Sequence, residues 1–265
     1  MRQKALFFVA GVLALSLGGG QGAAFFNSAS SPPAPKQPGD IPPLPQHETA
    51  KQLVVQAMRN QAASHSFHHD TAISIATVYM DGKKDESIVR STGDYTKTAY
   101  HETSRTFTGK QEKPRIELYY ADSHLYVGRQ EGKSGEWQWR MMKTPQNYAE
   151  PAFETNVLPF PFGDVSQLQY TRLDSRRIAF QGQLKDKVPA SVASVGVNGI
   201  LTLDASHRYI VQAQVKERVT VHPDNKKTGQ VRETVTDRTV SFYNMNEPVT
   251  IHVPQEAKEA SGKIK

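Results

Sequence analysis

Cysteine is absent from this chain of 265 residues. Without thiols the protein forms no disulfide bond, so its folded part has to be stabilised by its core alone. The absence also excludes a cysteine nucleophile and the type of lipid anchor that is attached to an N-terminal cysteine.

Common catalytic motifs are missing as well. The sequence has neither the Gly-x-Ser-x-Gly turn of many hydrolases nor the His-Glu-x-x-His pair of zinc peptidases. The run from Gly128 to Ser134 has too few residues between its glycines for a phosphate-binding loop, and a predicted strand follows it instead of a helix. We therefore expect a non-catalytic protein without a cofactor. A hydrolase site assembled from distant residues is the alternative.

One histidine-rich segment raises the question of a metal site. His65, His68, His69 and Asp70 are close in sequence. Alternation along a strand places His68 and Asp70 on one face and His69 on the other, so too few ligands converge. We expect no bound metal.

The first 26 residues have the pattern of an export segment. Arg2 and Lys4 precede an apolar stretch at residues 5–17, and small residues suited to cleavage follow it. Without cleavage, the uncharged residues 5–26 are long enough to anchor the chain in a bilayer. We therefore expect a signal peptide or an N-terminal anchor, with the body secreted or tethered to the outer face of the cytoplasmic membrane.

Residues 27–47 are rich in proline, which favours an extended spacer over a helix or a strand. Charge is spread along the rest of the chain. The net charge is +6, and basic pairs such as Lys83–Lys84 are mixed with acidic residues. This spacing is typical of a solvated surface, with a weak attraction to anionic lipid as the functional alternative. We expect no nucleic-acid binding.

The folded body is expected over residues 48–256, followed by a flexible charged tail at residues 257–265. Within residues 48–64, apolar side chains recur with the spacing of one helix face. Alternation and closely spaced turns then predict a meander of antiparallel strands. The predicted strands cover residues 72–80, 87–92, 97–108, 115–121, 124–128, 136–142 and 169–184, with one of the turns at Gly93–Asp94.

Prolines interrupt an apolar and aromatic segment at residues 144–168. They prevent a continuous helix, and the aromatic content is too high for a solvated loop, so the segment has to pack on something. We expect it to cover the sheet as a lid. Residues 189–195, a short apolar piece, are expected to form a helix.

The last part of the body shows the longest alternation. Residues 209–221 and 230–243 predict a long antiparallel hairpin. Val235 is odd-numbered, whereas Val240 and Phe242 are even-numbered, so we expect a β-bulge between Val235 and Val240. Long, bent strands favour a curved sheet.

Two residue patterns stand near the end of the chain. The first is Gly-x-Leu-x-Leu-Asp, from Gly199 to Asp204. The second consists of a strand, an asparagine, a short turn, another strand and a proline, and its matching residues are Phe242, Asn244, Pro248, Val249, Ile251 and Pro254. Together with the order of elements, these patterns resemble the LolA-like superfamily of envelope carriers. The family includes the periplasmic lipoprotein-sorting protein and the LppX and LprG group, whose lipidated cysteine this chain lacks.

The resemblance implies an α+β, mainly β fold. Its parts are a curved antiparallel sheet, forming a half-open barrel, an N-terminal helix, and a short helical or loop lid over the concave face. Acyl chains would lie in a trough on that face, under the lid. Core packing is the alternative role for the lid and for the two tryptophans, and a membrane contact is a further one for the tryptophans. The residues expected to line the trough or the lid are Ile73, Ile75, Leu118, Tyr120, Trp137, Trp139, Tyr148, Phe153, Phe160, Phe162, Val211 and Val215.

These expectations together describe a monomeric, exported, non-catalytic carrier or binding protein for a lipid or lipidated molecule in the bacterial envelope. Its partners would be lipid or lipoprotein acyl chains, with a membrane surface or a membrane protein as a further contact. The alternative is an envelope regulatory or interaction module of the RseB and MucB type, which acts on a membrane-bound partner.

Overall fold

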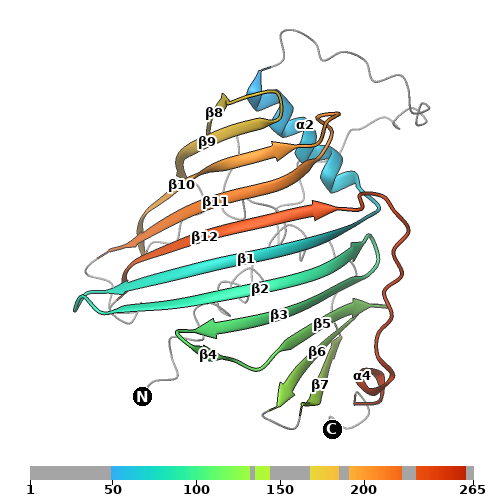
Figure 1. The fold of residues 1–265 in the computed structure, drawn as a ribbon. Helices are drawn as coiled ribbons and strands as arrows, with labels where there is room; N and C mark the ends of the chain where they lie inside the picture. The colour runs from blue at the N-terminus through green and yellow to red at the C-terminus, as the bar shows by residue number, and fades with distance from the viewer. Residues whose placement is uncertain (1–48, 132–134, 144–167, 185–190, 223–230, 261–265) are drawn as a thin grey trace. The chain divides into compact units, whose positions relative to one another are not determined.

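The computed structural model describes residues 49–131, 135–143, 168–184, 191–222 and 231–260. Within these ranges the chain forms one long helix, one large sheet and a short final helix (Figure 1). The elements are α2 (Ala50–Ala63), β1 (Ser66–Tyr79), β2 (Lys84–Thr96), β3 (Tyr100–Thr108), β4 (Gln111–Glu112), β5 (Ile116–Ala121), β6 (His124–Glu131), β7 (Glu136–Lys143), β8 (Gln169–Arg172), β9 (Arg177–Leu184), β10 (Val192–Leu203), β11 (Ile210–Val221), β12 (Val231–Tyr243) and α4 (Gln255–Ala260).

Helix α2 begins where the sequence provides a cap. The side chain of Thr49 accepts a hydrogen bond from the Gln52 backbone N–H, and the Gln52 side chain accepts one from the Thr49 N–H, which forms a capping box. The helix buries Leu53, Val54 and Ala57, as its spacing predicts. No helix in the described ranges is long and apolar enough to cross a membrane.

The sheet is antiparallel and curved and has twelve strands in the order β7-β6-β5-β3-β2-β1-β12-β11-β10-β9-β8, with β4 paired to β3. The predicted fold class and the predicted hairpin of β11 and β12 are confirmed. Strands β7 and β8 are the two edges, so the sheet is not closed. The first and last strands pair in the middle, where Asp70 of β1 lies opposite Ser241 of β12.

The two faces of the sheet differ. The face on which α2 packs, called here the helix-side face, carries Leu201, Ala213 and Val240, which are all fully buried. The backbone N–H of Ile210 on β11 donates a hydrogen bond of 3.1 Å to the side chain of Gln61 on α2. The opposite face, called the outer face, carries the residues that alternate with these along each strand. The core lies on the helix-side face, where α2 packs on β8 and β11, and it continues across the sheet to Phe67, Tyr95 and Tyr100.

The predicted bulge is wrong in its position. From Val235 to Val240, β12 keeps an unbroken register with both neighbouring strands. Val235 lies opposite Ala76 and Arg218 on the outer face, so the change of phase reflects an outward-facing valine. The register of β12 shifts instead opposite Val78 and Tyr79.

Three further expectations differ from the structure. Residues 192–195 belong to strand β10, because they alternate and pair with β11, and they form no helix. Residues 249–253 form no strand. They belong to a connection that passes the ends of β1, β2 and β3 and leads to α4, which packs on β6 and β7 (Figure 1). A flexible tail was expected from residue 257, but α4 continues up to Ala260. Ala257 is fully buried, which holds this helix against the rest of the protein.

Candidate functional site

The structure places most of the described trough candidates on the helix-side face. Pairing across the sheet puts Ile73, Ile75 and Val215 there, and Leu118 and Tyr120 lie on the same face of β5. Val211, which is half-buried, is the extra residue where the register of β10 and β11 shifts. The lid candidates lie outside the described residues. They are Tyr148, Phe153, Phe160 and Phe162.

Trp137 and Trp139 are on the outer face, so their assignment to the trough is corrected. Trp139 pairs with Gly128, which pairs with Glu117, and this row continues across the sheet to Asp70 on the outer face. Alternation correctly places the two tryptophans on one face. It does not show which face of the sheet is the apolar one.

The residues of the terminal patterns have structural roles. The side chain of Asp204 organises the turn between β10 and β11, accepting hydrogen bonds from the Ser206 hydroxyl and from the backbone N–H groups of Arg208 (2.6 Å) and Tyr209 (2.9 Å). Burial opposes the charge of Asp204, but these hydrogen bonds outweigh it and lower its pKa.

Two other positions of the patterns allow close approach or a tight turn. A Cβ atom on Gly199 would lie 2.0 Å from the backbone oxygen of Gln214 and 2.6 Å from the ring of Phe180, so only glycine fits at this position. Asn244 has a φ of 56°, a left-handed conformation that asparagine tolerates better than most residues.

The remaining described residues of the second pattern differ in burial. Phe242 is buried and packs edge-on against Phe67, with 5.9 Å between the ring centroids. Pro248 is exposed, and the Pro254 carbonyl accepts hydrogen bonds in the first turn of α4.

One end of the helix-side face is filled by the protein's own side chains. Leu201, Ala213 and Val240 form a row across β10, β11 and β12, each with no exposed surface. Leu203 and Ile178 beside them are equally buried. This part of the face is solid core and has no space for a ligand.

The same face continues beyond the solid rows with further aliphatic side chains. The next row contains the buried Val215 and the half-buried Ile73, and the row after it contains the buried Val197 and the half-buried Ile75. Helix α2 packs on β8 and β11 at the other end. The aliphatic surface therefore extends along the strands past the region that α2 fills.

Two charged residues interrupt this aliphatic surface. Arg238 lies between Ile73 and Val215 in the first of the two rows, and Glu217 lies diagonally next to it in the second row. Burial lowers the pKa of Arg238, although the charge of Glu217 opposes this effect. Burial likewise raises the pKa of Glu217 more than Arg238 lowers it. Neither residue was predicted from the sequence. The sequence did hold one indication, because Arg238 alternates in phase with Val240 and Phe242 and therefore faces the same side of the sheet as they do.

A second group of buried polar side chains lies on the helix-side face near β3. His69 is 1% exposed, with its ring parallel to that of Tyr100 at a centroid distance of 6.1 Å. Burial lowers its pKa from 6.5 to about 4. Glu102 accepts a hydrogen bond from the Tyr100 hydroxyl, and burial raises the pKa of this carboxyl group above its usual value.

The outer face carries an aromatic cluster over β3, β5 and β7. The rings of Trp137 and Trp139 stack at 5.6 Å, and Trp139 lies 5.9 Å from Tyr119. Tyr119 in turn stacks on His101 at 4.3 Å. A Cβ atom on Gly128 would lie 2.6 Å from the Trp139 ring, so this glycine makes room for the indole. Burial, helped by Glu117, raises the pKa of Tyr119 to about 12.

Next to this cluster, histidine and acid side chains meet on the outer face. His68 Nδ1 lies 2.6 Å from Asp94 Oδ1, and His101 Nδ1 lies 3.8 Å from Asp94 Oδ2. His69 points to the opposite face, as alternation predicts. Among the described residues, no group of three or more histidine or acidic side chains is arranged to hold a metal ion.

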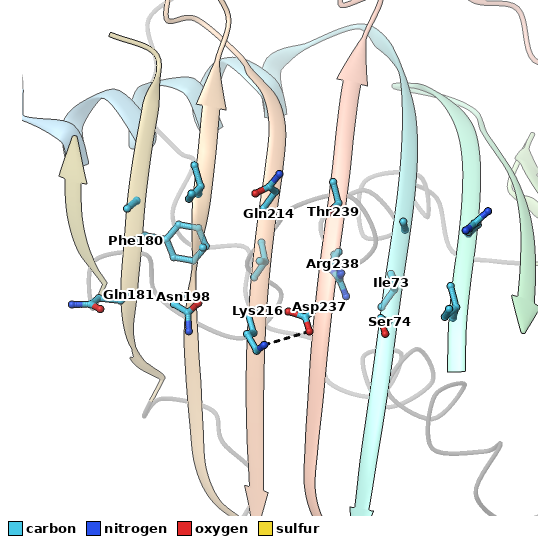
Figure 2. Close-up of a pocket in the computed structure, with 17 residues that line it drawn as sticks. Ile73, Ser74, Phe180, Gln181, Asn198, Gln214, Lys216, Asp237, Arg238 and Thr239 are labelled. Atoms are coloured by element: carbon cyan, nitrogen blue, oxygen red, sulfur yellow. Dashed lines mark ion pairs between the residues drawn. The ribbon is translucent and has the colours of Figure 1, made fainter. Parts of the chain in front are cut away.

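A shallow groove of about 740 Å³ crosses the sheet from β2 to β9 (Figure 2). Most of its lining consists of outer-face residues, and many of these are polar, including Ser74, Gln181 and Asn198. An ion pair between Lys216 and Asp237, 3.6 Å long, joins two of the strands (Figure 2). The groove is therefore polar and open, unlike the apolar trough expected from the sequence.

No known family model and no curated protein sequence matches the chain. Solved structures with a similar arrangement include a DUF1329 family protein from Desulfovibrio piger, with 10% identity over 77% of this chain and 95% of that chain and a TM-score of 0.25. Another is a β-barrel-like protein with a domain of unknown function, DUF1849, from Brucella abortus. It has 10% identity over 68% of this chain and all of that chain, with a TM-score of 0.28. At these TM-scores the likeness supports no inference about function.

Proposed function

We propose that this chain is an extracytoplasmic, non-catalytic binding protein that holds the acyl part of a lipid or lipidated molecule on the helix-side face of its sheet. The observation that carries the proposal is the extent of this face. Its aliphatic side chains continue along the strands beyond the end that α2 fills, and Ile73 and Ile75 among them are only half-buried.

The energy of acyl burial suits reversible transfer. Burying an acyl chain of about fourteen methylenes is favourable by roughly 11 kcal/mol relative to water, and a bilayer offers nearly the same gain. Moving such a chain between membrane and protein is therefore close to balanced. The transfer would need shielding from water but no nucleotide or metal.

Lipid analysis of the purified protein, combined with a matched pair of substitutions, tests this proposal. We expect co-purifying acyl chains in native mass spectrometry and in lipid extracts. Ile75→Gln on the helix-side face should reduce their amount several-fold, because it places an amide in the aliphatic surface. Ile88→Gln is the control, since Ile88 lies on the outer face and is 42% exposed. A protein that is free of acyl chains and takes up none from fluorescent lipid would rule the proposal out.

A second function is supported by the aromatic cluster of the outer face. Trp137, Trp139 and Tyr119 lie on the face away from α2, as an interaction module of the RseB and MucB type would require for contact with a membrane-bound partner. On this alternative, replacing both tryptophans by alanine abolishes binding to the partner and leaves lipid content unchanged. The carrier proposal predicts instead that Ile75→Gln lowers the lipid content and that replacing the tryptophans does not affect function.

A further inference from the structure

Arg238 is a cationic side chain in the middle of an aliphatic row. On the helix-side face it lies between Ile73 of β1 and Val215 of β11, and Val89 of β2 and Phe180 of β9 extend the row on either side. The neighbouring row towards α2 contains the fully buried Val240. The guanidinium group therefore lies at the border between the fully buried rows and the rows that contain the half-buried Ile73 and Ile75.

This guanidinium group has unused hydrogen-bonding capacity. Its Nη1 atom is buried and has no hydrogen-bond partner. Glu217 is the acid whose charge acts on it, but no ion pair within 4.0 Å joins the two among the described residues. A buried, unpaired charged donor is unfavourable, and a structural ion pair would have satisfied it.

We propose that Arg238 binds the acidic head group of an amphiphile whose acyl chain lies on the aliphatic surface. The shared chemistry is a group with two or more anionic oxygens, either a carboxylate or a phosphate, because the planar fork of arginine donates to two such oxygens at once. The inference rests on the proposed function and makes it more specific. It narrows the expected ligand from any lipid to a lipid with an acidic head group.

The direction of the acyl chain follows from the same geometry. Towards α2 the face is solid, so the chain has to run the other way along the strands, where Ile73 and Ile75 are only half-buried. Val197, Val195 and Val221 form the buried aliphatic floor in that direction. From the level of Val215 to that of Val221 the strand advances by roughly 20 Å at about 3.3 Å per residue. This length accommodates a long acyl chain.

The experiment compares acids with their uncharged counterparts at the same chain length. Dissociation constants are measured by isothermal titration or fluorescence displacement for palmitate and palmitate methyl ester, and for hexadecyl phosphate and hexadecanol. We expect the wild-type protein to bind at least one acid tenfold or more tightly than its uncharged counterpart. The acid with the larger preference identifies the head group as a carboxylate or a phosphate.

Three variants assign the preference to Arg238. Arg238→Met keeps an unbranched side chain and removes the charge, so it should lose the preference for acid while retaining the affinity for ester or alcohol. Arg238→Lys keeps the charge without the fork and should retain only part of the preference. Arg218→Met is the control, because Arg218 lies exposed on the outer face beside Glu233 at 3.8 Å, and it should behave like wild type. A urea titration of each variant verifies that it is folded.

Two results would overturn the inference and leave the proposed function intact. One is equal affinity of the wild type for acids and uncharged counterparts, and the other is an unchanged acid preference in Arg238→Met. If the wild type bound neither acids nor uncharged amphiphiles, the proposed function would fail, and this inference with it. Inorganic phosphate alone should not bind, because the acyl chain supplies most of the affinity.

Discussion

The buried imidazole of His69 should make the stability of the fold depend on pH in a defined direction. Its folded-state pKa is lowered from 6.5 to about 4, chiefly by burial and next by the nearby charge of His68. Asp70 and Asp94 oppose this shift, and His101 adds to it. The ring is 1% exposed, and its Nε2 atom has no hydrogen-bond partner, so the folded protein offers no good site for a second proton.

The magnitude follows from the difference between the two states. Below about pH 6.5 the unfolded chain binds a proton at His69 that the folded protein does not bind until about pH 4. The stabilising contribution is therefore fully present above pH 6.5 and is lost as the pH falls towards 4. At about 1.36 kcal/mol per pKa unit, the total loss is about 3 kcal/mol.

Urea unfolding of wild type and His69→Leu at several pH values between 7 and 4 measures this contribution. Leucine is similar in size and does not titrate, so the difference between the two proteins isolates His69 from the acids that titrate in the same range. We expect the stability of the wild type to fall relative to the variant by about 3 kcal/mol over this range. His252→Gln is the control, because His252 is exposed in the connection to α4 and surface substitutions change stability by about 0.5 kcal/mol or less.

Parallel stability curves for wild type and His69→Leu would refute this reasoning. They would mean that the folded protein accepts a proton at His69 as readily as the unfolded chain does. The ring would then have access to water or to an acceptor, in conflict with its burial against Tyr100 and Gly93.

Two further substitutions test the packing of the helix-side face. Gly199→Ala should destabilise the fold by about 1–3 kcal/mol in urea unfolding, because the added Cβ atom would lie 2.0 Å from the Gln214 backbone oxygen and 2.6 Å from the Phe180 ring. Gly196→Ala on the same strand meets no atom within 4 Å and should be close to neutral, and equal effects at the two glycines would contradict the packing described here. Leu201→Ala should cost about 2–5 kcal/mol, since Leu201 is fully buried, and a cost below 1 kcal/mol would show that this end is not solid core.

Local alternation was sufficient to predict most strands but not how they pair across the sheet. Strand β5 lies within one residue of its predicted bounds, and helix α2 lies within its predicted range. The pairing of β1 with β12 was not predicted, because Asp70 and Tyr243, which share a hydrogen bond of 3.0 Å, are 173 residues apart. Alternation identifies the inward residues of a strand and says nothing about its partner.

Glycine was misinterpreted where it serves packing instead of a turn. Gly93 was expected in a turn but lies inside β2, where a Cβ atom would be 2.4 Å from the His101 backbone oxygen and 2.7 Å from His69 Nε2. A sequence shows the glycine, but the ring that needs the space comes from the neighbouring strand. The same reason explains why Gly128 beneath Trp139 gave no signal.

The candidate site was predicted only in its apolar part. Ile73, Ile75 and Val215 were assigned to a trough on the concave face that the family resemblance implies, and pairing places them together on the helix-side face. Arg238 was not singled out, and charged residues in strands usually face water. The burial of Arg238 becomes visible only when the neighbouring strands are in position.

This inward charge bears directly on how the proposed carrier would hold its ligand. An acyl chain gains nearly the same free energy on the sheet as in a bilayer, so the chain alone gives no preference for the protein. The head group decides the balance, because it is hydrated at a membrane surface and loses water when it enters the protein. A neutral head group would pay this cost without compensation, and its lipid would stay in the membrane. An acidic head group would recover the cost at Arg238, whose own unpaired donor would be satisfied by the same contact. Arg238 would therefore determine whether a ligand leaves the bilayer as well as which ligand is bound.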